Sequence, residues 1–210
     1  MAIESIFTFI IASSLISIAP GPDNIFVLTQ SALYGRRSGV IVTFGLCTGL
    51  VVHTSAVALG VAAIFQASSL AFNILKFVGA GYLIYLAWQA FMAKPSDFDS
   101  SSGTYLSTKV LYFRGIIMNI TNPKVSIFFL AFLPQFTNPH EGDLVTQFFV
   151  LGIVFISVAL VVFCCIAVLA GSLGDWLTGT PKNQVYLNRV AGVVFSGLAL
   201  KLVTSIIMYN

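Results

Sequence analysis

Long apolar stretches are the feature that most constrains what this chain can fold into. Residues 144–171 include no charged side chain, and five further apolar runs are distributed along the 210 residues. A helix needs about 20 apolar residues to cross the roughly 30 Å of hydrocarbon in a bilayer. Only 8% of the residues are charged, against about 25% in ordinary soluble domains. The sequence therefore predicts an all-α polytopic membrane protein rather than a soluble or disordered chain.

Six membrane-spanning segments are expected where apolar runs are bounded by charges, prolines or glycines. They lie at about 3–35, 38–65, 70–93, 109–136, 144–171 and 186–208. No basic segment precedes the first run, so we expect a retained span rather than a cleaved signal peptide. The polar segment 94–107 has the composition of a flexible linker, and residues 175–183 are expected to form a loop. The linker divides one transmembrane domain into a first repeat, 1–93, and a second repeat, 108–210.

Proline interrupts the first and fourth spans near their middles, at Pro20-Gly21-Pro22 and at Pro123. Gly21 before Pro22 and Asn122 before Pro123 have the order of an N-cap residue and a first helical residue. Each break is therefore expected to begin a new half-helix. Three spans per repeat would give the two repeats opposite orientations in the membrane. Inverted repeats with broken helices one and four are typical of secondary transporters.

The basic residues near the loops predict the orientation of the chain. Loops two and four contain no Lys or Arg, whereas seven basic residues lie in or beside loops one, three and five. The positive-inside rule places those three loops in the cytoplasm and both termini outside. The seven residues are Arg36, Arg37, Lys94, Lys109, Arg114, Lys182 and Arg189.

Four charged residues fall inside the expected spans, where each costs at least about 2.5–3.5 kcal/mol. Lys76 and Lys201 lie near the outer face, and their long stems can reach the headgroups. Asp23 and Lys124 each follow the proline of a break. The positive end of a half-helix suits Asp23 but disfavours Lys124, which therefore needs an anionic partner.

Two interpretations of Asp23 and Lys124 remain open from the sequence. They could form an ion pair that only fastens the two halves together, which would be a weak source of stability. Alternatively, they could form a binding site, because half-helix N-termini in transporters point at substrate carboxylates. Lys124 would then attract a carboxylate, and Asp23 would receive an ammonium group or a proton. Opposite charges at matching breaks suit a zwitterion.

Further candidates lie on spans two, three and four. Gly45, Gly49 and His53 share one face of span two, and the glycine pair lets another helix approach closely. His53 is expected to be either a proton relay or a buried hydrogen-bonding residue between helices. Tyr82 and Tyr85, which together with Gln89 form a polar stripe on span three, could line a cavity. Asn119 precedes the second break and could satisfy freed backbone groups.

Several of these motifs together resemble the LysE/RhtB family of amino-acid exporters in bacterial inner membranes. The similarity covers essentially the whole chain. The matching segments are residues 19–24, the Gly45…Gly49…His53 face, residues 76–83 with Tyr85, Asn119…Asn122-Pro123-Lys124, and residues 187–192.

The resemblance implies proton-driven export of amino acids or close derivatives, with homoserine- and threonine-type substrates favoured. It implies no catalytic chemistry, so no enzyme activity, cofactor, metal or nucleic-acid partner is expected; self-association into a homo-oligomer is left open. Asp23 and His53 would couple transport to protons. The substrate-binding residues would be Asp23, Asn24, Asn119, Asn122, Lys124, Tyr82 and Tyr85.

Three other classes of membrane protein compete with this interpretation. A thiol-redox electron carrier of the CcdA/DsbD type needs a cysteine at each break, but the cysteines are Cys47, Cys164 and Cys165, in spans two and five. An intramembrane protease is disfavoured, because neither a Gly-x-Ser-x-Gly nor a His-Glu-x-x-His motif is present. The scarcity of charge along the spans disfavours a passive channel with polar rings.

Overall fold

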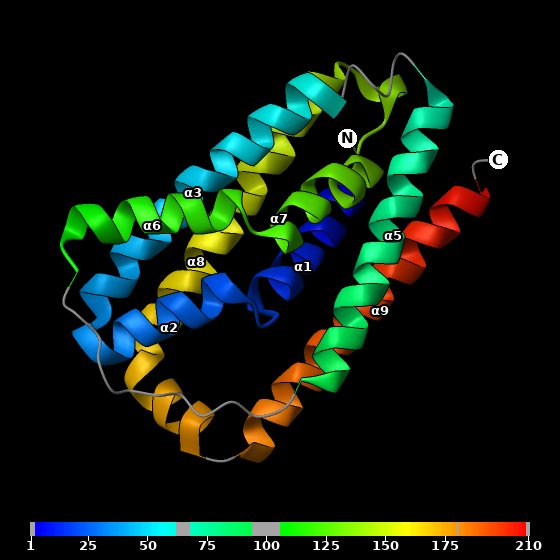
Figure 1. Ribbon diagram of the computed structural model, residues 1–210. Helices are drawn as coiled ribbons and strands as arrows, with labels where there is room; N and C mark the ends of the chain where they lie inside the picture. The colour runs from blue at the N-terminus through cyan, green and yellow to red at the C-terminus, as the bar shows by residue number, and fades with distance from the viewer. Residues whose placement is uncertain (1–2, 62–67, 94–105, 180, 209–210) are drawn as a thin grey trace.

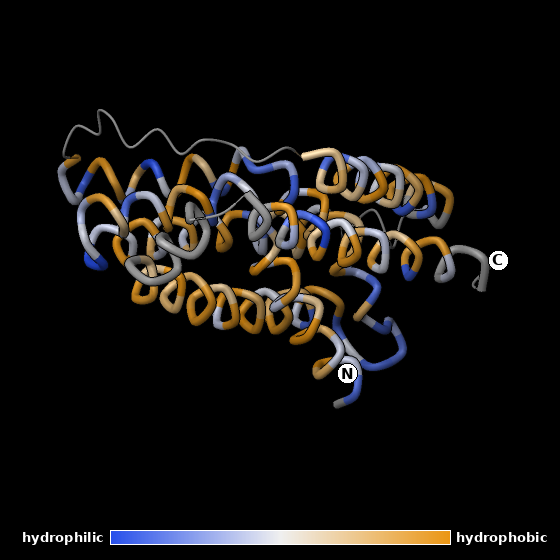
Figure 2. Tube along the Cα trace, turned by 90° about the horizontal axis from the view of Figure 1, so that it is seen from below, coloured by the Kyte–Doolittle hydropathy of each residue, from blue (hydrophilic) through white to orange (hydrophobic). Residues whose placement is uncertain are grey.

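The computed structural model describes residues 3–61, 68–93, 106–179 and 181–208, and every regular element within these ranges is helical (Figure 1). Apolar residues predominate along the helices (Figure 2). This confirms an all-α polytopic membrane protein. Three helical segments are long and apolar enough to cross a membrane alone, and two bent pairs raise the count to as many as five among the described residues. Six spans stay a prediction, as does the inverted relation of the repeats.

Both predicted helix breaks are present. Helix α1, Ile3–Ile18, is followed after a short gap by α2, Pro22–Tyr34, at an angle of 60°. Helix α6, Thr108–Ile120, is followed by α7, Pro123–Ile127, and the segment 123–136 is bent by 48° from α6. Pro22 and Pro123 are the first residues of their helices, where the missing N–H of proline costs no hydrogen bond.

The second half of the fourth expected span changes its winding along its length, a feature that was not predicted from the sequence. After α7 the chain forms the π-helix η2, Phe128–Phe132, and then the 3-10 helix η3, Leu133–Phe136. Pro134 explains this change, because its ring cannot fit within continuous α-helical hydrogen bonding. The result is an irregular segment directly after the second break.

The remaining elements match the other expected spans, with one exception. Helix α3, Arg36–Ala56, continues into the π-helix η1, Val57–Val61, and α5 covers Ser69–Met92. The short 3-10 helix η4, Pro139–Glu141, precedes the long helix α8, Leu144–Gly179, and α9 covers Pro181–Met208. The loop expected at 175–183 is therefore wrong: α8 continues until Gly179, and Pro181 begins α9 almost immediately. Most of the expected linker, residues 94–105, lies outside the described residues.

Helices from before and after the segment 94–105 pack against each other: α3 contacts α6 and α8, and α5 contacts α9. Figure 1 shows α5 and α9 side by side as a pair at one edge of the molecule. The two termini lie on the opposite side of the molecule from the α2–α3 and α8–α9 connections (Figure 1). This arrangement agrees with termini on one side of a membrane and basic connections on the other, although the orientation itself stays a prediction.

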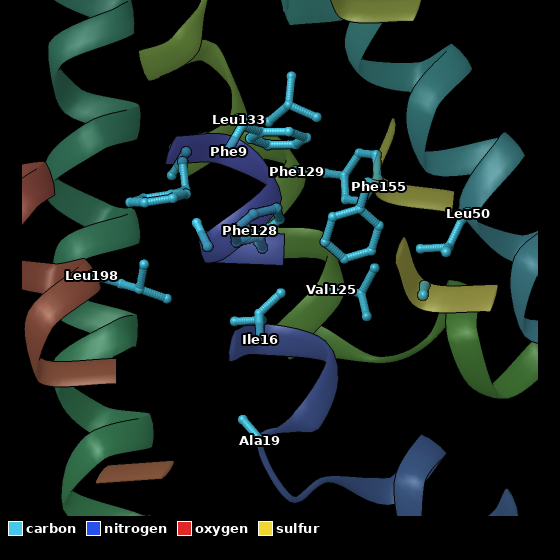
Figure 3. Close-up of a cluster of buried hydrophobic side chains, with 14 of the residues drawn as sticks. Phe9, Ile16, Ala19, Leu50, Val125, Phe128, Phe129, Leu133, Phe155 and Leu198 are labelled. Atoms are coloured by element: carbon cyan, nitrogen blue, oxygen red, sulfur yellow. The ribbon is translucent and has the colours of Figure 1, made fainter. Parts of the chain in front are cut away.

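A cluster of buried phenylalanines fills the space above the first break, between α1, α8 and the irregular segment (Figure 3). Phe9 packs edge-on against Phe136 at 5.0 Å between ring centroids, and Phe155 lies 5.1 Å from Phe128 and 5.0 Å from Phe129. Aromatic pairs at such distances add about 0.5–1.5 kcal/mol each beyond their burial. The cluster lies on the side of the first break toward the start of α1 (Figure 3).

Helices α3 and α6 approach each other through glycine, as the Gly45 and Gly49 face predicted. A Cβ atom on Gly45 would collide with the carbonyl oxygen of Tyr112, and one on Gly49 would lie 2.7 Å from the Cβ of Asn119. We expect Gly45→Ala to lower the stability of the protein by about 1–3 kcal/mol, because the two backbones must move apart. Thermal unfolding of the purified protein in detergent measures this effect.

Gly81→Ala is the matched control, because nothing lies within 4 Å of a Cβ atom at that position. Replacing glycine by alanine raises the intrinsic helix propensity by the same amount at both positions, about 1 kcal/mol. The difference in unfolding temperature between the two variants therefore measures the effect of the steric clash alone. Equal unfolding temperatures for the two variants would contradict this packing of α3 on α6.

Candidate functional site

A cavity of about 490 Å³ lies where the two broken spans meet α5 and α9. Both breaks contribute to its wall. On α5 the lining residues follow one helical face down to Ala93, the residue that ends the helix, and on α9 they lie toward its start. The cavity therefore extends toward the side where α5 ends and α9 begins. Its wall consists of Pro20, Gly21, Pro22, Ile25, Tyr82, Leu86, Gln89, Ala90, Ala93, Asn122, Pro123, Lys124, Asn188, Ala191 and Phe195.

Lys124 reaches from the second break to the first. Asn122 caps α7, and its side-chain oxygen accepts a hydrogen bond from the backbone N–H of Lys124 at 3.0 Å. The Lys124 ammonium donates to the carbonyl oxygens of Ala19 at 2.9 Å and Ile16 at 3.2 Å. It also lies 3.5 Å from Oδ1 of Asn24. The side chain is only 6% exposed, so these acceptors replace most of its water.

Asn24 completes this cap on the end of α1. Its Nδ2 donates to the carbonyl oxygen of Ser17 at 2.6 Å and lies 3.5 Å from that of Ile18. The carbonyl groups at the end of α1 have no helical donors. They accept hydrogen bonds from two side chains instead, one from each half of the protein. The negative end of α1 also stabilises the charge of Lys124, which answers the conflict seen in the sequence.

Asp23 lies behind the cavity wall rather than in it. It is 1% exposed, and its Oδ2 accepts a hydrogen bond from Nδ2 of Asn119 at 3.1 Å. Among the described residues, no ion pair within 4.0 Å links Asp23 to Lys124, so a direct pair between them is not what fastens the two halves. Asp23 lines a separate, enclosed space of about 10 Å³ together with Ser17, Asn119 and Lys124. Lys124 borders both spaces.

His53 forms the interhelical hydrogen bond that was one of its two expected roles. Its Nε2 lies 3.1 Å from the carbonyl oxygen of Asn119, and its ring lies 5.6 Å from that of Phe129. Because a carbonyl only accepts, Nε2 carries the proton in this arrangement. His53 and Asp23 are thus joined through Asn119, and they are close enough to interact electrostatically. A role in proton relay stays a prediction.

The polar stripe of α5 lies only partly in the cavity. Tyr82 lines it, whereas Tyr85 is 45% exposed and does not. Tyr85 instead accepts a hydrogen bond from Nε2 of Gln89 at 2.5 Å, and Gln89 lines the cavity. Asn188 of α9 also lines the cavity. Gln89 and Asn188 were not among the predicted substrate-binding residues, although Gln89 was predicted to lie on the same polar stripe as Tyr82.

The expected residues thus form two layers. Lys124 and Asn122 line the cavity with Tyr82 and the residues of both breaks, namely Pro20, Gly21, Pro22 and Pro123. Asn24, Asp23, Asn119 and His53 lie behind them, linked by hydrogen bonds from Lys124 to Asn24, from Asn119 to Asp23, and between His53 and Asn119.

The residues that could bind a metal or react as thiols are spread over several helices. In the part of the chain that the structure describes, no three His, Cys, Asp or Glu residues are grouped to hold a metal ion. Cys47, Cys164 and Cys165 are free thiols on α3 and α8, and they do not line the cavity. The cysteine-free breaks that the sequence indicated are retained in the folded protein.

Comparisons with known proteins show the family of the chain. Residues 14–206 match the family described as LysE type translocator. A homoserine/homoserine lactone efflux protein of Salmonella typhimurium is 38% identical over 196 residues, which cover 93% of this chain and 94% of that protein. A leucine efflux protein of Salmonella choleraesuis is 29% identical over 205 residues, with 94% of each chain covered. A membrane protein of Vibrio cholerae is 30% identical over 98% of this chain and 99% of its own length. No solved structure matches the chain.

Proposed function

This chain belongs to the LysE type translocator family, and from that membership we propose that it exports amino acids or close derivatives by exchange with protons. Homoserine- and threonine-type substrates are favoured, in line with the name of the relative that is 38% identical. A translocator moves its substrate without converting it, so the protein is not an enzyme. The membrane is the bacterial inner membrane, with both termini outside.

The observation that carries this proposal is the position of Lys124. Its ammonium borders the cavity while also holding the end of α1. A substrate carboxylate entering the cavity competes with the α1 carbonyls for this ammonium, and charge-assisted hydrogen bonds favour the carboxylate. Binding would thereby loosen the link between the two broken spans, and Asn122 and Tyr82 would orient the substrate.

Asp23 is proposed as the proton-coupling residue. Its carboxylate is buried on the far side of Lys124, where protonation would remove a charge close to the ammonium. His53, joined to it through Asn119, is proposed to relay the proton. An inward-moving proton and an outward-moving carboxylate would thus act on opposite sides of the same lysine.

The direction of the cavity fits loading from the cytoplasm. Under the proposed orientation, the cavity extends toward the basic connections, which face the cytoplasm. We propose that the phenylalanine cluster of Phe9, Phe128, Phe129, Phe136 and Phe155, which is fully packed in the core, blocks the outer side. Transport would then require the halves to rock about the breaks, which the inverted-repeat plan permits.

Efflux of labelled homoserine, threonine and leucine from cells carrying the protein tests this function. We expect faster efflux than from cells without it for at least one of the three, with homoserine or threonine fastest. No acceleration for any of them would contradict amino-acid export. Substrate-independent conductance would instead indicate a channel.

A further inference from the structure

The cavity at the breaks carries charge of only one sign. Among the described residues that line it, Lys124 is the one charged side chain, and neither Asp nor Glu is present. Its other polar side chains, Tyr82, Gln89, Asn122 and Asn188, are neutral. A zwitterionic amino acid would therefore find a partner for its carboxylate but no carboxylate for its ammonium.

Asp23 does not supply the missing negative charge in this arrangement. Its carboxylate faces the enclosed space of about 10 Å³, where it is 1% exposed and bonded to Asn119. That space is too small for a substrate, being about the size that one water molecule requires. An ammonium group in the larger cavity would have to displace the wall formed by Asn122 and Lys124 to reach Asp23.

The end of the cavity at the breaks is well suited to an anion. Gly21 lines the cavity beside Lys124, and a Cβ atom there would lie 3.0 Å from the ammonium nitrogen. A carboxylate in the cavity would compete for this ammonium with the carbonyl oxygens of Ile16 and Ala19 and with Oδ1 of Asn24. Its full negative charge favours it over these neutral acceptors.

The rest of the wall suits an uncharged, partly apolar group. Ile25, Leu86, Ala191 and Phe195 provide apolar surface. The volume of about 490 Å³ falls within the range of roughly 300–1,000 Å³ typical of ligand pockets, which leaves space beyond that of a small amino acid. Desolvating an unpaired ammonium is costly, whereas an amide in its place can bond to the side-chain amide of Gln89.

We infer that this cavity accepts carboxylates whose second polar group is uncharged, with N-acylated amino acids as the defining class. This inference rests on the proposed export function and names a substrate class for the same site. The carboxylate binds at Lys124 and Asn122, and the acyl-amide lies between α5 and α9.

Transport of three related compounds by proteoliposomes containing the full chain tests the inference. The probes are leucine, N-acetylleucine, which lacks the ammonium charge, and leucinamide, which lacks the carboxylate. We expect N-acetylleucine to be transported at least as fast as leucine. Leucinamide should be at least about tenfold slower, because it loses a charge-assisted bond to Lys124.

Gln89→Glu gives a second readout, because it places a negative charge in the wall with almost no change in shape. The rate ratio of N-acetylleucine to leucine should fall about tenfold in this variant. Gln135→Glu is the matched control, since Gln135 lies on η3 and does not line the cavity. Its ratio should equal that of the natural protein.

The outcomes separate this inference from the proposed function. Transport of leucine or homoserine without transport of N-acetylleucine would overturn the inference and leave amino-acid export intact. A Gln89→Glu variant with an unchanged ratio would overturn the assignment of the substrate class to this cavity. If none of the compounds, homoserine included, crosses these membranes faster than it crosses those of liposomes without the protein, both the inference and the proposed function fail.

Discussion

Replacing Lys124 by glutamine is expected to slow transport by roughly 10- to 100-fold while leaving the protein folded. In the natural protein the carbonyl oxygens of Ile16 and Ala19 accept hydrogen bonds from the ammonium, and the amide can still donate to them. It cannot attract a carboxylate by charge, however, and a hydrogen bond to a charged group contributes about 1.5–3 kcal/mol. The site should therefore lose affinity for its substrate more than it loses stability.

Initial rates of substrate efflux from proteoliposomes, normalised to the amount of inserted protein, measure this effect. Lys109→Gln removes a positive charge from the exposed start of α6, away from the cavity, and should transport normally. Lys124→Met removes the hydrogen bonds as well, so it should also lower the unfolding temperature. A Lys124→Gln protein that transports at the natural rate would show that the lysine only caps α1.

Asp23→Asn is expected to abolish stimulation by a proton gradient while preserving substrate exchange. Asparagine resembles a permanently protonated aspartic acid, and its oxygen can still accept the hydrogen bond from Asn119. A gradient of one pH unit supplies about 1.4 kcal/mol per proton, which sustains about a tenfold concentration ratio of substrate. The natural protein should approach that ratio with one proton per substrate, and the variant should reach a ratio of about one.

The accumulation ratio is measured in proteoliposomes with a set pH difference, and exchange is measured with labelled substrate on one side only. Asp143→Asn is the control, because Asp143 is exposed at the start of α8. The backbone N–H and the hydroxyl of Thr146 donate to its carboxylate and lower the pKa of Asp143. Asparagine can still cap the helix there, so coupling should persist. Full gradient-driven accumulation by Asp23→Asn would exclude this residue as the proton site.

The parts of the fold set by local chemistry could be predicted from the sequence. Pro22 and Pro123 end one helix and begin the next because of their rings, and Gly45 and Gly49 indicate a close helix pair. The loop expected near Asp175 was wrong, since a charged residue at a membrane edge does not itself end a helix. The change to π and 3-10 winding around Pro134 was not predicted, although a proline inside an apolar span is a local signal for irregular winding.

The partner of Lys124 could not be predicted, because it is not a side chain with opposite charge. Asp23 is the acidic residue nearest in the pattern, yet the ammonium is bonded to the backbone carbonyls of Ile16 and Ala19 at the end of α1 and to Asn24. Carbonyl groups occur at every residue, so only the folded chain shows which ones lie within reach. Asn188 presents the same limit, since it joins the cavity only through the packing of α9 beside α5.

The most direct test of the central claim is gradient-driven efflux through the purified, reconstituted protein. Proteoliposomes are loaded with labelled homoserine, threonine or leucine and placed in a more acidic medium, with and without a protonophore. We expect saturable efflux of at least one substrate, which the inward proton gradient accelerates and the protonophore returns to the rate measured without a gradient. Efflux no faster than from loaded liposomes without the protein would contradict amino-acid export. Efflux at the same rate with and without the proton gradient would contradict coupling to protons.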